Sequence, residues 1–110
     1  MYRLSIIIDE IYLKYLSPAK KLGLTLNLDF PDTTIKVEDG ERIKNDVEKS
    51  VRKMVDKSYK GDITIAVRKG KIVITDTGTV LSKAACALIS NEHISVKSRV
   101  GFGTEVTISF

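Results

Sequence analysis

Few side chains in this sequence have the types and spacing that chemistry requires. Asp76 and Gly78 follow an apolar run, and Gly101, Gly103 and Thr104 form a second glycine-rich segment near the C-terminus. A carboxylate at a strand end can accept a hydrogen bond, and glycine lets a ligand approach the backbone because it has no Cβ. Taken alone, both segments are also ordinary turn sequences.

The sequence has one histidine and one cysteine, His93 and Cys86. No Ser-His-Asp or Cys-His constellation follows from so few residues. His93 stands beside Asn91 and Glu92 in a connection, where we expect a solvated or capping role. Cys86 excludes an internal disulfide, is expected to fill the core, and fits a reducing cytosol.

Two lysines, Lys49 and Lys53, lie four residues apart in a charged segment. An ammonium group has three donors and no lone pair, so it repels Mg²⁺ and cannot coordinate it. On a helical wheel both lysines lie roughly 105 to 145° from the centre of the apolar stripe, at 100° per residue. Phosphate contact and simple solvation both stay open for them.

The composition is that of one ordinary globular domain covering residues 1–110. Hydrophobic residues make up 43% of the chain and charged residues 29%, and a bulky ligand would have to sit in a surface groove. The net charge of +4 permits an anionic partner, but only 6% of residues are aromatic and none is Trp, so nucleic acid is not expected. The apolar run Leu4 to Ile8 is too short to span a bilayer, so we expect a cytoplasmic chain without membrane contact.

Apolar periodicity predicts the elements that must position these residues. A three- and four-residue spacing predicts a helix over residues 2–22, with a kink or break near Ser17 because Pro18 follows, and a short second piece reaching Lys21. Further helices are expected over 41–57 and 81–90, and strands over 24–29, 34–37, 63–67, 71–75, 94–97 and 104–110. This order predicts helices layered on one face of a mixed sheet.

With this order of elements, three blocks resemble motifs of the ATP-binding domain of sensor histidine kinases, the GHKL or Bergerat fold. "DGERIKNDVEKSVRKMVDK", residues 39–57, resembles the N-box helix, "VITDTGTV", residues 73–80, the first glycine box, and "SRVGFGTEVTISF", residues 98–110, the last glycine box and closing strand. The resemblance covers nearly the whole chain. It implies an α/β (α+β) two-layer sandwich: a mixed, mostly antiparallel sheet of five to six strands with three helices on one face.

In the family, the first glycine box supplies a carboxylate that accepts a hydrogen bond from the adenine amino group, and Asp76 is at the matching position. Gly78 matches the glycine that lets the backbone approach the purine. Thr104, after Gly101 and Gly103, matches the residue that supports this carboxylate and the adenine through water. The resemblance therefore implies that the base-recognition end of the groove is retained.

The phosphate end departs from the family pattern. Lys49 and Lys53 stand where the family has its Asn or Glu and its Mg²⁺-binding Asn; shifting the alignment by one turn places Asn45 at the first site but still leaves Lys49 at the second. The family's long lid is absent, because residues 76–80 run directly into "LSKAACALIS", and Val80 replaces the box's second glycine. Neither Mg²⁺ nor autonomous kinase activity is expected.

Three functions stay open, and whether the chain is an enzyme stays open with them. The first is a degenerate module, a C-terminal fragment or a stand-alone protein, that docks a response regulator or a helical dimerisation and phosphotransfer domain. The second is a nucleotide-binding ATPase or kinase domain active only when lid and phosphoacceptor are supplied elsewhere. The third is a sensor that binds ATP or ADP without Mg²⁺, using Asp76 for adenine and Lys49 or Lys53 for phosphate. Binding of ATP or ADP is expected to be weak or absent.

Overall fold

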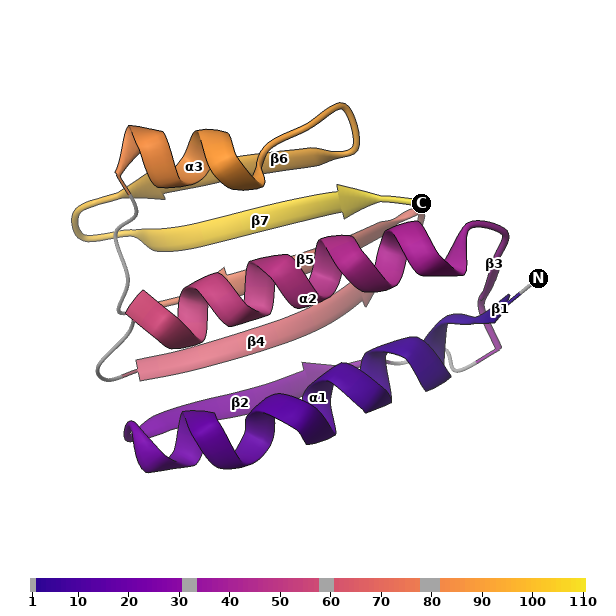
Figure 1. Ribbon diagram of the computed structural model, residues 1–110, viewed down its shortest axis with the longest axis horizontal. Helices are drawn as coiled ribbons and strands as arrows, with labels where there is room; N and C mark the ends of the chain where they lie inside the picture. The colour runs from indigo at the N-terminus through magenta and orange to yellow at the C-terminus, as the bar shows by residue number, and fades with distance from the viewer. Residues whose placement is uncertain (1, 31–33, 58–60, 78–81) are drawn as a thin grey trace.

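The computed structural model describes residues 2–30, 34–57, 61–77 and 82–110, which form one sheet covered by helices on one face (Figure 1). The sheet has five strands in the order β2-β4-β5-β7-β6, with β2 and β4 parallel and every other neighbouring pair antiparallel. The strands are β2 (Leu24–Asp29), β4 (Gly61–Arg68), β5 (Lys71–Asp76), β6 (Ile94–Arg99) and β7 (Gly103–Ser109). The helices are α1 (Leu4–Lys21), α2 (Gly40–Lys57) and α3 (Lys83–Ile89). The predicted fold class is confirmed.

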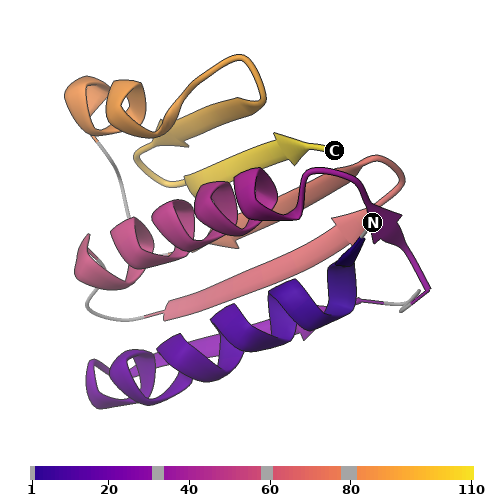
Figure 2. The same cartoon turned by 45° about the vertical axis from the view of Figure 1, so that its right-hand side comes forward.

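Alternation along the strands decides which face carries the core. In β5, Ile72 and Ile74 are fully buried on the helix side, and the register places them beside buried residues of β4 and β7. The apolar stripe of α2, which includes Val47 and Val51, closes over them and is also fully buried. The helices stay in one layer in front of the sheet in the turned view (Figure 2). The opposite face of the sheet carries the polar half of each strand.

Helix α1 runs through Pro18 as one helix, so of the predicted kink or break near Ser17 the break is wrong, and no separate second piece forms. Proline lacks only the one N–H that would bond the carbonyl of Lys14, and it stands in the last turn, where little helix remains to be lost. The buried Ala19 anchors that turn to the core. The helix ends where Gly23 adopts a positive φ of 78°.

The N-terminal residues form a small separate sheet. β1 (Tyr2–Arg3) pairs antiparallel with β3 (Lys36–Val37), so the first helix begins two residues later than predicted and the predicted strand 34–37 is shorter. Both termini lie at this end of the molecule, whereas the end of β5 and the start of β7 lie at the opposite end (Figure 1). Among the described helices, none is long and apolar enough to cross a membrane.

Candidate functional site

Asp76 ends β5 with its side chain on the helix side of the sheet. Strand alternation puts it on the same face as Ile72 and Ile74, and only 1% of the residue is exposed. The register places it between Ile63 of β4 and Thr104 of β7. Asp76 therefore places a buried carboxylate at the end of an apolar row, on the face of the sheet that the helices cover.

The chain after Asp76 is tied back to the neighbouring strand. The backbone N–H of Thr77 donates to the Asp62 carbonyl at 3.1 Å, and the Thr77 hydroxyl accepts from the Asp62 N–H at 3.1 Å. These two bonds fix the direction in which the chain leaves β5. Gly78 lies outside the described residues.

Gly103 brings the backbone of β7 against that of Asp76. A Cβ built on Gly103 would lie 2.1 Å from the Asp76 carbonyl oxygen, and its φ is +92°. Gly101 also has a positive φ, of +83°, but a Cβ there would meet nothing within 4 Å. Gly103 is thus required for close approach, and Gly101 only for the turn.

Thr104 follows Gly103 and is as buried as Asp76, at 2% exposed. Its hydroxyl lies 2.8 Å from that of Ser98, which faces it across β6 and β7. Asp76, Gly103 and Thr104 therefore come together as predicted, at the adjoining ends of two paired strands. Ser98 was missed, although the predicted pairing of the last two strands would have placed it opposite Thr104.

Lys49 and Lys53 lie on one face of α2 and line a groove of about 240 Å³ between α2 and α3. Both residues are half-buried, and the other lining residues are Arg52, Asp56, Leu88 and Ile89. Asn45, the alternative position, is exposed and does not line this groove. Arg52 was missed, yet its spacing of three from Lys49 places both on the same helix face.

A short connection leads from Asp76 at the end of β5 to α3, whose Leu88 and Ile89 line the groove. Only residues 77–82 separate β5 from α3, and Ser82 caps α3 by accepting a hydrogen bond from the Ala85 N–H at 3.1 Å. Leu88 on this helix is 72% exposed at the edge of the groove. The end of the molecule away from the two termini holds the end of β5, the start of β7 and the last turns of α2 (Figure 1).

The same fold occurs in solved structures of sensor histidine kinases. QseC, in its cytoplasmic segment, superposes with a TM-score of 0.77 at 10% identity, over 98% of this chain and 74% of that one. The nucleotide-free catalytic domain of ThkA gives 0.72 at 18% identity, over 98% and 94%. AdeS of Acinetobacter baumannii gives 0.72 at 14% identity, over 98% of this chain and 65% of that one. The chain has the fold of a histidine-kinase catalytic domain.

At the level of sequence, no protein-family model matches the chain. No curated protein matches it either. The fold is therefore shared with these three structures at no more than 18% sequence identity. The chain spans 65% of the AdeS chain.

The histidine-kinase fold implies Mg²⁺ bound from α2, and the residues present there do not fit that ion. Magnesium takes oxygen ligands, whereas Lys49, Arg52 and Lys53 present only nitrogen donors with positive charge. Asp56 is the single carboxylate among the described residues that line the groove. Across the described ranges, no group of three or more His, Cys, Asp or Glu side chains is placed to hold a metal.

His93 lies in the connection before β6, and Cys86 lies in α3. The backbone N–H of His93 donates to Asn91 Oδ1 at 2.7 Å, and its imidazole lies 3.3 Å from Glu92, just before β6. Cys86 is half-buried in α3, where it packs on the core.

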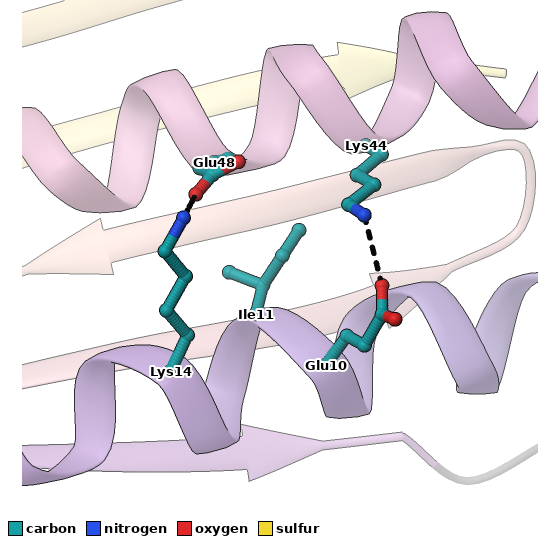
Figure 3. A pocket seen from close by; sticks show the side chains of 5 residues that line it. All are labelled: Glu10, Ile11, Lys14, Lys44 and Glu48. Carbon is teal, nitrogen blue, oxygen red and sulfur yellow. Dashed lines mark hydrogen bonds and ion pairs between the residues drawn. The ribbon is translucent and has the colours of Figure 1, made fainter.

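A second hollow, between α1 and α2, is spanned by ion pairs (Figure 3). Lys14 pairs with Glu48, and Lys44 pairs with Glu10 at 3.0 Å, on either side of the buried Ile11. The hydrogen bond from Lys14 lowers the pKa of Glu48, and the same bond raises the pKa of Lys14. The pKa of Tyr15, whose hydroxyl also donates to Glu48, is raised mainly by burial. These contacts join two helices and use groups outside the predicted site.

Proposed function

We propose that this chain is a degenerate histidine-kinase ATPase-like domain, formed by residues 1–110 as one cytoplasmic domain, that acts as a docking module in signalling. In this proposal it has no autonomous kinase activity. The observation that carries the proposal is the row of basic side chains, Lys49, Arg52 and Lys53, on the helix where the fold implies a magnesium ligand. Positive charge at this position opposes the ion that phosphoryl transfer needs.

The short connection supports the same proposal. Phosphoryl transfer depends on positioning the nucleotide and on excluding water, which in many enzymes is done by a segment that closes over the site. Residues 77–82 reach from the end of β5 to the first turn of α3 and leave no length for a covering segment of that kind. Loss of the metal ligand and of the cover would reduce catalysis far more than either loss alone.

We propose a protein partner: a response regulator, or a helical dimerisation and phosphotransfer domain. The histidine kinase ThkA, part of which resembles this chain with a TM-score of 0.69, has been solved in complex with the response regulator TrrA. The groove between α2 and α3 suits such docking, because the exposed Leu88 offers an apolar anchor beside Lys49, Arg52 and Lys53. Hydrophobic anchors next to complementary charge are the usual composition of a protein interface.

An activity assay tests the central part of this proposal. The purified chain is incubated with Mg²⁺ and ATP, with and without a separate helical phosphotransfer domain from a histidine kinase. We expect no phosphate release and no phosphohistidine above the level of a protein-free control. Turnover that depends on both Mg²⁺ and this chain would overturn the proposal.

A second candidate function is nucleotide binding without Mg²⁺, favoured by the buried Asp76 and Thr104 and by the close approach at Gly103. ShkA, whose structure resembles this chain with a TM-score of 0.72, has been solved with AMPPNP. Here Asp76 would accept from adenine, and Lys49 and Lys53 would neutralise the phosphates of ATP or ADP. An NMR titration with ADP in EDTA then shifts the resonances of Gly101 and Thr104, and Asp76→Asn removes these shifts. Identical shifts in Asp76→Asn would exclude this role.

A further inference from the structure

The outward face of α1 carries large apolar side chains that the fold leaves in solvent. Ile6 is 61% exposed and Leu13 is 68% exposed. The opposite face of α1 is buried against the core. Both views show α1 at the margin of the helix layer, and no other element lies over its outward side (Figures 1 and 2).

The residues of this face follow the spacing of a helix that pairs with another helix. Ile6, Asp9, Leu13, Leu16 and Lys20 are separated by three, four, three and four residues, which is the alternation of a heptad seam. At 100° per residue they lie within an arc of about 80°. Asp9 and Lys20 are exposed, and Leu16 is half-buried.

This seam is complementary to itself when a second copy is laid antiparallel. In the register that places Leu13 opposite Leu16 of the second copy, Asp9 lies opposite Lys20 of the second copy. Twofold symmetry repeats both pairs, so two leucine layers are flanked by two opposite-charge pairs. A parallel pairing would instead place Asp9 against Asp9.

We propose that the outward face of α1 is a self-association surface whose partner is a second copy of this chain. This interface accounts for the exposure of Ile6 and Leu13 on one face of the helix. It leaves each sheet on the far side of its own helix, so the two bodies do not collide. The site at the ends of β5 and β7 is not involved, and this inference is independent of the proposed function.

The interface is one helix against another, so the association should be weak. Interfaces of this size fall below the area of about 1,200 Å² at which stable complexes begin. We expect a dissociation constant between roughly 10 μM and 1 mM. Covalent attachment of this chain to any other dimeric segment would strengthen the contact by raising the effective concentration.

Sedimentation velocity over about 10 μM to 1 mM chain tests the proposal. The wild-type chain should shift from monomer to dimer across this range, and Leu13→Glu should stay monomeric throughout. Leu88→Glu is the matched control, because that leucine is equally exposed but lies on α3, and it should dimerise as the wild type does. Circular dichroism confirms that each variant is folded. A wild-type monomer at every concentration, or a dimer that Leu88→Glu breaks and Leu13→Glu does not, would overturn the proposal.

A charge exchange tests the register. Asp9→Lys and Lys20→Glu should each weaken dimerisation at least about tenfold, because each single change opposes like charges across the seam. The double variant Asp9→Lys/Lys20→Glu should recover the wild-type dissociation constant. A double variant as weak as the single variants would refute the antiparallel pairing.

Discussion

A Cβ at position 103 has no room, because the Asp76 carbonyl oxygen would lie 2.1 Å from it. The contact joins the two strand ends that hold the buried Asp76 and Thr104. At the scale of single residues, the join between the two strand ends therefore depends on Gly103 for packing, while Gly101 serves only the turn. This difference gives a matched pair of substitutions.

Gly103→Ala should lower the free energy of unfolding by about 2 to 5 kcal/mol, since it combines strain at positive φ with overpacking. Gly101→Ala should cost only about 1 to 2 kcal/mol, since its φ is also positive but its surroundings are open. Urea unfolding monitored by circular dichroism measures both. Equal losses for the two variants would show that the close contact with Asp76 is not tight.

Glu48 gives a prediction about pH. Its pKa is lowered in the folded state, chiefly by the hydrogen bond from Lys14, so its contribution to stability is fully present above the unfolded pKa of about 4.5 and is lost as pH falls through the folded value. Glu48→Gln should therefore be less stable than wild type at pH 7, and this deficit should shrink as pH falls below about 4.5. Thermal melts across this range measure the difference.

Glu10→Gln is the control for this experiment. Glu10 pairs with Lys44 at 3.0 Å, but both side chains are largely exposed, so solvent screens the pair and the substitution should change little at any pH. A Glu48→Gln deficit that persists unchanged at pH 3.5 would show that packing, and not the charge, is what Glu48 contributes.

At the scale of elements, α3 is the shortest of the three described helices, with seven residues. A serine hydroxyl bonds each of its ends: Ser82 accepts from the Ala85 N–H, and Ser90 donates to the Cys86 carbonyl. A helix of this length is shorter than helices that are stable alone. Ser82→Ala should destabilise the chain by about 0.5 to 2 kcal/mol, and Ser82→Asp should not. Hydrogen exchange should show the loss in α3 and leave α2 protected; faster exchange in both helices alike would contradict local capping.

Helix α1 contains Pro18 in its last turn, although alanine has the higher helix propensity. Pro18→Ala restores the missing N–H to the Lys14 carbonyl and removes a poor helix former, so we expect a gain of about 1 kcal/mol in unfolding free energy. Ser17→Ala, at the neighbouring exposed position, should change it by only a few tenths of a kcal/mol. A loss on Pro18→Ala would mean that the proline shapes this turn to fit the core.

Much of the arrangement of elements could be predicted from apolar spacing, because burial on one face leaves a periodic trace. The stripe of α2 places Lys49 and Lys53 together, whereas the burial of Asp76 could not be predicted from alternation, because Ile72, Val73 and Ile74 are consecutive apolar residues. The break predicted at Pro18 is absent because core contacts hold the last turn, and the local sequence does not show those contacts. β3 was predicted only as part of a longer strand, and β1 left no trace, because a two-residue strand is too short to show a period.

The roles of single site residues were harder to predict than the fold. Gly103 and Gly101 are the same residue type in the same turn, and only the distance to the Asp76 carbonyl separates their roles. Leu88 in a small-residue helix looks like core, yet it is 72% exposed because α3 is too short and too far to the side to bury it. Exposure of this kind depends on how whole elements are placed and has no local signature.

At the scale of the whole molecule, the chain keeps the histidine-kinase fold, while the helix that should hold magnesium presents lysine and arginine. The central claim is that this protein does not bind nucleotide through Mg²⁺. Calorimetric titration with ATP and ADP, each in Mg²⁺ and in EDTA, tests it most directly. We predict either no heat at millimolar nucleotide or weak binding that EDTA leaves unchanged. Tight binding that appears only with Mg²⁺ would contradict the account.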